Sequence, residues 1–256
     1  METYPLTQEQ IQFFRENGYL TLKGVFTEEE MAELREAAEA LLNQRLDPRI
    51  EISQNDPEYE KIFVQKVNLW RIDERMRKFA LHPRLGKIAA QLAGTTMRIW
   101  HDHLLAKMPG DSKPTAWHQD IPYWPHTVGN QLGIWIPLYD VDEQMGCLGV
   151  IPKSHTLGVL PAHDFRDLAD VFQYLPESMR TPVWLPLKAG DCSVHHGLTL
   201  HGANANRSNR PRVAFAIFYM PDGICYTGAG HVVTDGQGFE VGQPLRGELF
   251  PIVGEP

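Results

Sequence analysis

The second half of the chain is built from short apolar segments, and this pattern restricts the possible folds more than any other feature. From Thr95 onward, stretches rich in Val, Ile and aromatic residues alternate with turns that carry Gly, Pro and Asn. The apolar stretches cover 96–107, 132–138, 147–151, 182–186, 191–196 and 212–220. Short strands at such spacing are typical of an antiparallel sandwich or a jelly-roll barrel. We therefore expect a mainly β fold.

Helical patterns are confined to the first hundred residues. Apolar residues at helical spacing predict a helix near 7–17. An extended stretch at 19–22 follows, and a capping box at 27–30 then predicts a helix that runs to about Asn43. A third helix is expected at 84–93. These helices should flank the barrel and pack on its outside.

The length of the chain bounds its organisation. Its 256 residues suffice for one large domain or two small ones, and no repeat or linker divides them. We expect a single domain over 1–256, with the barrel and its mouth loops in about 95–256. A chain of this length buries roughly three quarters of its unfolded surface, so a metal would not be needed merely to fold. The Gly-rich stretch 221–256 predicts a long loop over an open end of the barrel.

Charge and cysteine content exclude several classes of protein. The net charge is −8 and the pI is near 5.8, with no block of one sign, which argues against a nucleic-acid partner. Three cysteines far apart give neither a disulfide framework nor a thiolate metal site, and they favour a reducing compartment. No apolar run approaches the roughly 18 residues of a membrane span. We therefore expect a cytoplasmic protein whose partner is a small-molecule substrate.

The triplet His118-Gln119-Asp120 is the main candidate for chemistry. An imidazole and a carboxylate two residues apart at a strand end can hold one face of a metal ion. A second histidine, for which His201 is the candidate, would complete a set of two histidines and one carboxylate that leaves positions open for a cosubstrate and oxygen. Such ligands suit Fe(II), whereas a structural zinc would take more nitrogen or sulfur ligands.

An arginine strengthens this interpretation. Arg212 follows His201 by eleven residues across a polar turn, 203–210, which predicts a hairpin with both residues at its base. The planar guanidinium binds both oxygens of a carboxylate and stays charged when buried. A metal site with such an arginine beside it suggests a dicarboxylate cosubstrate.

Other histidines have competing interpretations. His195 and His196 are alternatives to His201 as the distal ligand, although only His201 pairs with the arginine across the predicted turn. His155 is expected to be a turn residue that hydrogen-bonds locally, and His126 an ordinary surface residue. For Arg71, Arg98 and His231 a solvated or salt-bridged role is expected over a role in substrate binding.

Four stretches of the sequence resemble the phytanoyl-CoA dioxygenase family. These are Leu6–Tyr19, Lys107–Trp124, Gly146–His155 and Leu200–Arg212. Together they extend over nearly the whole chain, and their order is far more specific than a single triplet. The resemblance implies a double-stranded β-helix, a jelly-roll or cupin-like barrel, that uses Fe(II), O2 and 2-oxoglutarate as cosubstrate.

The resemblance also assigns residues. By position, His118, Asp120 and His201 match the iron ligands, and Arg212 matches the arginine that anchors the distal carboxylate of 2-oxoglutarate. One departure is visible, because many members carry a serine where this chain has Ala203. Further matches to positions in or near the cosubstrate pocket are Lys66, Gln119, Trp135 and His103.

The reaction implied by the resemblance is hydroxylation of an unactivated C–H of a small organic or acyl substrate, with release of succinate and CO2. Related halogenases replace the carboxylate ligand by a small residue, so the presence of Asp120 favours oxygen transfer. Desaturation, epoxidation and ring closure stay open as other outcomes. A non-catalytic jelly-roll module that binds a metal or a carboxylate is the alternative from another class. The aromatics Trp117, Tyr123, Trp124 and Trp135 are expected either in the pocket or in the core.

Overall fold

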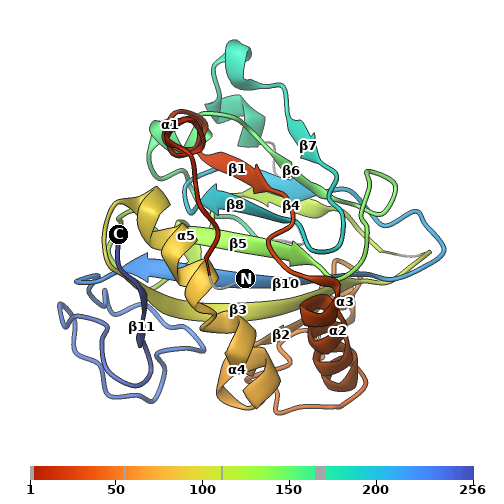
Figure 1. Cartoon of the computed structure of the whole chain (residues 1–256), viewed down its shortest axis with the longest axis horizontal. Coiled ribbons are helices and arrows are strands. Elements are labelled where there is room, and N and C mark those ends of the chain that lie inside the picture. The colour runs from red at the N-terminus through yellow and green to blue at the C-terminus, as the bar shows by residue number, and fades with distance from the viewer. Residues whose placement is uncertain (1–2, 55, 111, 165–170) are drawn as a thin grey trace.

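Two antiparallel sheets face each other in the computed structural model, which describes residues 3–54, 56–110, 112–164 and 171–256 (Figure 1). The larger sheet has the strand order β1-β8-β5-β10-β3-β11, and β2 also pairs with β3. Its strands are β1 (Tyr19–Leu22), β2 (Val64–Val67), β3 (Met97–Lys107), β5 (Leu132–Pro137), β8 (Cys192–His196), β10 (Arg212–Pro221) and β11 (Ile252–Gly254). The smaller sheet has the order β4-β9-β6-β7. It consists of β4 (Thr115–His118), β6 (Leu148–Val150), β7 (Val183–Leu185) and β9 (His201–Ala203).

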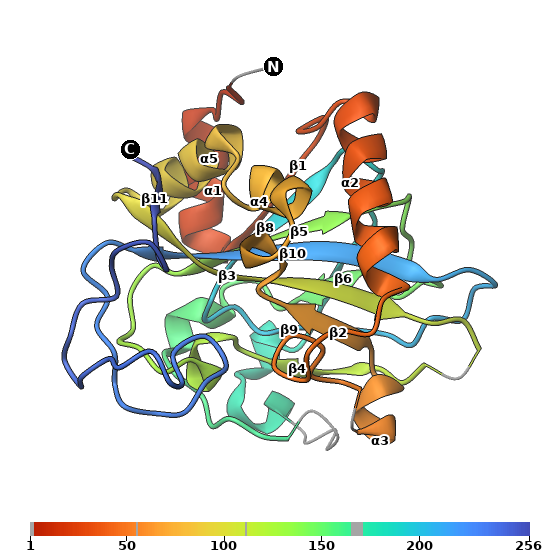
Figure 2. The same ribbon diagram turned by 90° about the horizontal axis from the view of Figure 1, so that it is seen from below.

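Four of the five α-helices that the structure describes cover the outer face of the larger sheet, whereas α3 (Pro57–Glu60) lies beside β2 on the side of the smaller sheet (Figure 2). The α-helices are α1 (Gln8–Asn17), α2 (Glu28–Leu42), α3 (Pro57–Glu60), α4 (Glu74–Ala80) and α5 (Pro83–Ala93). Capping boxes at Thr7 and Thr27 satisfy backbone N–H groups at the starts of α1 and α2. The expected mainly β fold with flanking helices is confirmed.

Strand β10 shows how the larger sheet divides the interior into two cores. Its large side chains Phe215, Ile217 and Tyr219 pack against the helices, while Ala214 and Ala216 face the smaller sheet. This follows from the two-residue period of a strand. Because small residues lie on the inner face in the half of β10 next to Arg212, the space between the sheets is not completely filled there, and a cavity can form.

The sequence pattern identified most of the long elements, and the elements that it missed are mostly short. All six predicted apolar stretches contain a strand, and the three predicted helices are present within a residue or two. Missed elements are α3, α4, β2, β4, β9 and β11. Most of them span only three or four residues, too few to show a period, and their pairing depends on partners far along the chain.

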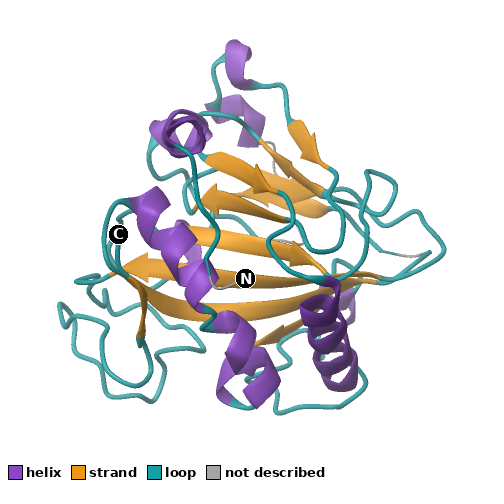
Figure 3. Cartoon of the chain, viewed as in Figure 1, coloured by secondary structure: helices purple, strands orange, loops and turns teal. Residues whose placement is uncertain are grey.

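Loops make up most of the chain after β10 (Figure 3). The segment 222–251 has no helix and no strand, as its glycine content predicts, and it packs Leu245 and Phe250 into the core between the sheets. His231 and Val232 of this segment line the cavity described below. In the described part of the chain, no helix has the length and apolar character required to cross a membrane.

The helix-facing core should dominate stability. Phe215 is fully buried between β10 and the helices, so Phe215→Ala should lower the free energy of unfolding by about 3–5 kcal/mol. Val241→Ala, at a side chain that is 74% exposed, is the control and should change it by less than about 0.5 kcal/mol. Urea unfolding followed by circular dichroism measures both, and equal effects would contradict this assignment of the core.

Candidate metal centre

His118 and His201 are direct neighbours across two strands of the smaller sheet. His118 ends β4 and pairs in register with His201, which begins β9. Side chains on paired residues share one face of a sheet, and the two ring centroids lie 4.2 Å apart. The short strand β4, which carries no apolar pattern, therefore places the first histidine against the second.

Backbone carbonyls fix the orientation of both rings. His118 Nδ1 lies 2.8 Å from the Ala116 carbonyl oxygen, and His201 Nδ1 lies 3.0 Å from that of Thr199. In each ring the Nδ1–H donates to the carbonyl, which leaves the lone pair on Nε2. Histidines that bind metals commonly have this arrangement.

Asp120 supplies the third group. Its backbone N–H donates to the Gly197 carbonyl at 2.9 Å, which holds the residue after β4 against the chain after β8. Asp120 Oδ1 lies 3.6 Å from His118 Nε2 and 3.6 Å from His201 Nε2. One ligand atom from each of His118, Asp120 and His201 lies within 4.8 Å of the others, and all three residues are buried. This set can hold one metal ion on one face.

The electrostatics of the three groups suit a metal. Burial alone would raise the pKa of Asp120, but the His201, His118 and His195 imidazoles offset it, and the pKa lies well below its usual range. Burial and the neighbouring His118 hold the pKa of His201 well below its usual value. The carboxylate is therefore ionised and the imidazole neutral, which are the forms that bind metals.

His195 contacts the carboxylate rather than joining the metal group. His195 Nε2 donates to Asp120 Oδ2 at 3.0 Å. The other carboxylate oxygen, Oδ1, therefore faces His118 and His201. Gly133, opposite His195 on β5, makes room for the ring, because a Cβ at Gly133 would lie 2.8 Å from it. His196 Nδ1 instead accepts the Leu198 N–H. Of the three candidates for the distal position, the geometry brings His201 to the metal group.

Arg212 reaches the same cavity from the larger sheet. The cavity has a volume of about 230 Å³ and is lined by the three candidate ligands and by Arg212. The guanidinium is buried, and its Nε and Nη1 have no hydrogen-bond partner among the described residues. Burial lowers its pKa to about 10, so it stays charged at neutral pH. An unpaired buried cation of this kind is suited to a carboxylate.

The predicted hairpin between His201 and Arg212 is wrong. β9 pairs with β4 and β6 of the smaller sheet, whereas β10 pairs with β3 and β5 of the larger one. The polar turn 203–210 thus connects two sheets, and the imidazole and the guanidinium meet across the space between the sheets. Both residues do face one interior, as expected, but from opposite walls.

Two of the predicted pocket residues point elsewhere. Lys66 lies on the opposite face of β2 from Gln65 and Val67, which line the cavity, and its Nζ donates to the carbonyls of Leu41 and Gln44. Gln119, between two ligand candidates, points away from them and bonds the backbone of Gly158, Leu198 and Leu160. Neither lines this cavity, because neighbouring positions on extended chain face opposite sides.

The remaining candidates sort into lining and core residues. Trp135 and His103 line the cavity, and the Trp135 ring lies 5.5 Å from the Arg212 guanidinium carbon. Tyr123 and Trp124 line it too, whereas Trp117 packs against Trp184 and Phe172.

The other predictions for polar residues are mixed. Arg98 bonds Asp222, and His155 bonds the Arg15 carbonyl from a turn, as expected. His126 is buried against Trp100, so the surface prediction for it is wrong. His231 lines the cavity, which the sequence did not predict.

Sequence reasoning also missed Gln65 and His101, which line the cavity. The signal available was alternation: His101, His103 and Leu105 occupy every second position of β3 and face the cavity together. His103 Nδ1 accepts a hydrogen bond from Gln65 Nε2 at 3.0 Å.

Comparison with known proteins identifies the family. The profile of the phytanoyl-CoA dioxygenase family matches residues 14–214. The chain belongs to the phytanoyl-CoA dioxygenase family. The peroxisomal phytanoyl-CoA dioxygenase of Mus musculus is 26% identical over 84% of this chain and 68% of that protein. The human protein of the same name is 24% identical over 84% of this chain and 68% of its own.

Solved structures of 2-oxoglutarate-dependent enzymes share the fold. The 2-oxoglutarate-dependent carbocyclase SnoK from nogalamycin biosynthesis is 31% identical, with a TM-score of 0.81 over 97% of this chain and 96% of that one. The epimerase SnoN, solved with Fe3+, 2-oxoglutarate and nogalamycin RO, is 29% identical, with a TM-score of 0.83 over 96% and 98%. The predicted family, jelly-roll fold, enzyme class and cofactors, iron and 2-oxoglutarate with O2, are confirmed.

The contact between His195 and Asp120 predicts a specific defect. His195→Ala removes the hydrogen bond that holds Oδ2, so the affinity for Fe(II) or Mn(II) should fall about tenfold to a hundredfold. His195→Gln should recover part of it, because its amide can still donate. His196→Ala, at the neighbouring ring that faces away, should bind metal as the unchanged protein does. Anaerobic metal titration measures all three, and an unaltered affinity in His195→Ala would refute the positioning role.

Proposed function

We propose that this chain catalyses the Fe(II)- and 2-oxoglutarate-dependent oxidation of a C–H bond in a small organic molecule, with hydroxylation as the outcome. His118, Asp120 and His201 would hold the iron, and Arg212 would bind the distal carboxylate of 2-oxoglutarate. The observation that carries the proposal is the buried, unpaired guanidinium of Arg212 in the same cavity as the three candidate ligands. A structural metal site would not require that cation.

The protein's part in the reaction is to bind, orient and exclude water. Iron with 2-oxoglutarate supplies the oxidising power, and the chain supplies a site with ligands on one face only. His195 keeps Asp120 Oδ2 engaged, so that the carboxylate offers Oδ1 to the metal. The aromatic lining, which includes Trp124 and Trp135, excludes water from the reacting centre.

Thr115 compensates for the missing serine at Ala203. The two residues pair across β4 and β9, and both line the cavity with Arg212. We propose the Thr115 hydroxyl as a donor to the carboxylate that Arg212 would bind, because Thr115 lies opposite the position where other members carry the serine. His103 and Trp135 complete the proposed surroundings of the cosubstrate. Lys66 and Gln119 do not reach the cosubstrate, and they support the site only through their hydrogen bonds to the backbone.

The chain works as one domain in this proposal, since the site takes residues from both sheets. A carbocyclase and an epimerase among the similar structures favour ring closure or epimerisation as the second candidate outcome. The cytoplasmic location stays a prediction. The three free cysteines support it, whereas the mouse and human relatives are peroxisomal by name.

The first experiment needs no substrate. Anaerobic addition of Fe(II) and 2-oxoglutarate to metal-free protein should produce a saturable visible charge-transfer band, because the keto acid chelates the iron. Asp120→Ala should lose the band and the substrate-independent turnover of 2-oxoglutarate. A folded, iron-loaded protein without the band would instead favour the non-catalytic binding module.

Arg212 sets the affinity for the cosubstrate. Arg212→Met should raise the 2-oxoglutarate concentration that half-saturates the band about tenfold to a hundredfold, the effect of losing hydrogen bonds between charged groups. Thr115→Val should raise it by a smaller factor, about threefold to tenfold, because one neutral donor is lost. Iron affinity without 2-oxoglutarate should not change in either variant. An unchanged half-saturation in Arg212→Met would remove Arg212 from the cosubstrate site.

A further inference from the structure

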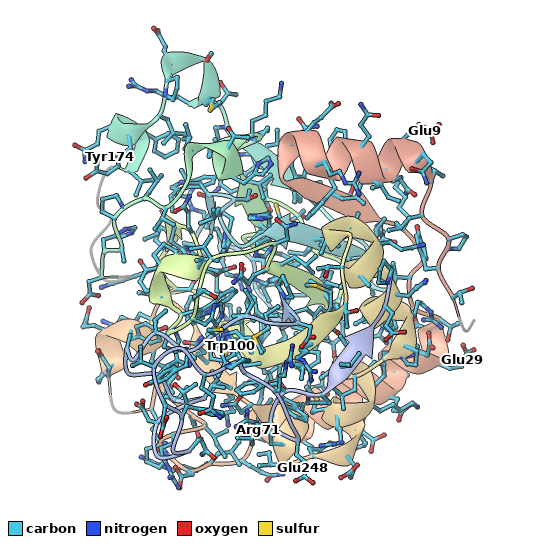
Figure 4. The ribbon with its side chains drawn as sticks, turned by 90° about the vertical axis from the view of Figure 1, so that its left-hand side faces the viewer. Glu9, Glu29, Arg71, Trp100, Tyr174 and Glu248 are labelled. Atoms are coloured by element: carbon cyan, nitrogen blue, oxygen red, sulfur yellow. The ribbon has the colours of Figure 1, made fainter. Side chains whose placement is uncertain are left out.

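A β-bulge in β3 directs two consecutive side chains into the space between the sheets. Tyr219 of β10 pairs with Ile99, but the next residue back, Phe218, pairs with His101, so Trp100 is the extra residue. Trp100 packs into the core between the sheets, and His101 lines the cavity. Figure 4 labels Trp100 beside the segment that follows β10, whose Phe250 stacks on its ring. Bulges of this kind re-aim side chains beside active sites.

His101 is buried without a hydrogen-bond partner. Its side chain is 1% exposed, and neither ring nitrogen bonds any described residue. Its ring stacks on Phe218 at 4.9 Å and approaches the edge of Trp124 at 5.8 Å. A buried polar group of this kind costs free energy unless something bonds it, so a ligand in the cavity is its natural partner.

A second imidazole beside His101 has a fixed donor. His231 Nδ1 accepts the Val233 N–H at 3.2 Å, which leaves the proton on Nε2. The His231 ring lies 5.5 Å from His101 and also lines the cavity. Burial lowers the pKa of His231 to about 4, so the ring is neutral. Together His101 and His231 offer hydrogen bonds without charge.

The charges of the cavity already balance without a substrate. Among its described lining residues, Arg212 is the one lysine or arginine and Asp120 the one carboxylate. The positive charges of a divalent metal and Arg212 would balance the negative charges of Asp120 and a dicarboxylate cosubstrate. A charged substrate group in the cavity would then lie buried without a counter-charge, which is costly.

From these observations we infer a substrate subsite formed by His101, His231, Trp124 and Phe218, which takes an uncharged group bearing a hydroxyl or carbonyl oxygen. The inference rests on the proposed function, since it assigns Asp120 and Arg212 to the metal and the cosubstrate. Within the cavity the substrate is therefore a neutral oxygen compound and not a carboxylate, a phosphate or an ammonium.

Three probes that share a naphthalene ring and differ in one substituent test this subsite. Protein loaded with Mn(II) and 2-oxoglutarate is titrated by equilibrium dialysis with 2-naphthol, naphthalene and 2-naphthoate. The uncharged 2-naphthol should bind most tightly. His101→Phe should weaken 2-naphthol binding about fivefold to tenfold, the effect of one hydrogen bond, and leave naphthalene unaffected. His101→Gln, which keeps a donor and an acceptor, should restore part of the affinity. His155→Phe, on a remote turn, is the matched control and should bind all three as the unchanged protein does.

The outcomes separate this inference from the function it rests on. In protein that forms the charge-transfer band, three results would reject the subsite and leave the proposed oxygenase function intact. These are binding of 2-naphthoate as tight as that of 2-naphthol, no binding of any probe, and unchanged 2-naphthol binding in His101→Phe. If the band does not form, the proposed function fails first. Retention of the band in His101→Phe and His101→Gln shows that both variants are folded around an intact metal site.

Discussion

The hydrogen bond from His195 to Asp120 is the contact on which the rest of the site depends. His195 belongs to the larger sheet, and Asp120 follows β4 of the smaller one, so this 3.0 Å contact joins the two walls of the cavity. It directs Oδ1 toward His118 and His201. Because both partners are buried, either one alone would leave a polar group without a partner, and the contact keeps the two sheets at one spacing.

The two faces of the larger sheet have different roles: one packs against the helices, and the other lines the cavity. Large side chains such as Phe215 and Tyr219 pack toward the helices, while Gly133 and Ala216 on the inner face leave volume for rings and ligands. The candidate site residues therefore lie on the side away from the helix-facing core. The inner face instead carries buried groups without partners, Arg212 and His101, whose cost the helix-facing core offsets.

The sequence predicted the elements that have a period and the residues that occur in a motif. His118, Asp120 and His201 were found from their spacing and the family resemblance, and the structure brings them together. The hairpin to Arg212 was wrong because loop length does not reveal whether a turn stays within a sheet or crosses between two. Lys66 and Gln119 were misplaced because a match by position does not give the direction of a side chain, which strand pairing decides for Lys66 and local backbone contacts decide for Gln119. The alternation of His101 with His103 and Leu105 was visible but was not used, and the bulge that also turns Trp100 inward cannot be identified from one strand alone.

The same reasoning explains how similar chains can yield different products. In the proposed function the metal group and Arg212 define where oxidation starts, and they come from the smaller sheet and from β10 of the larger one. The proposed substrate subsite is formed by the bulge in β3 and by the long segment after β10 that has no regular structure and contributes His231. The segment after β10 forms no helix or strand, so its side chains can change without disturbing the metal site. In this proposal that segment helps to choose which C–H meets the metal, which is consistent with a carbocyclase and an epimerase sharing the architecture of this chain.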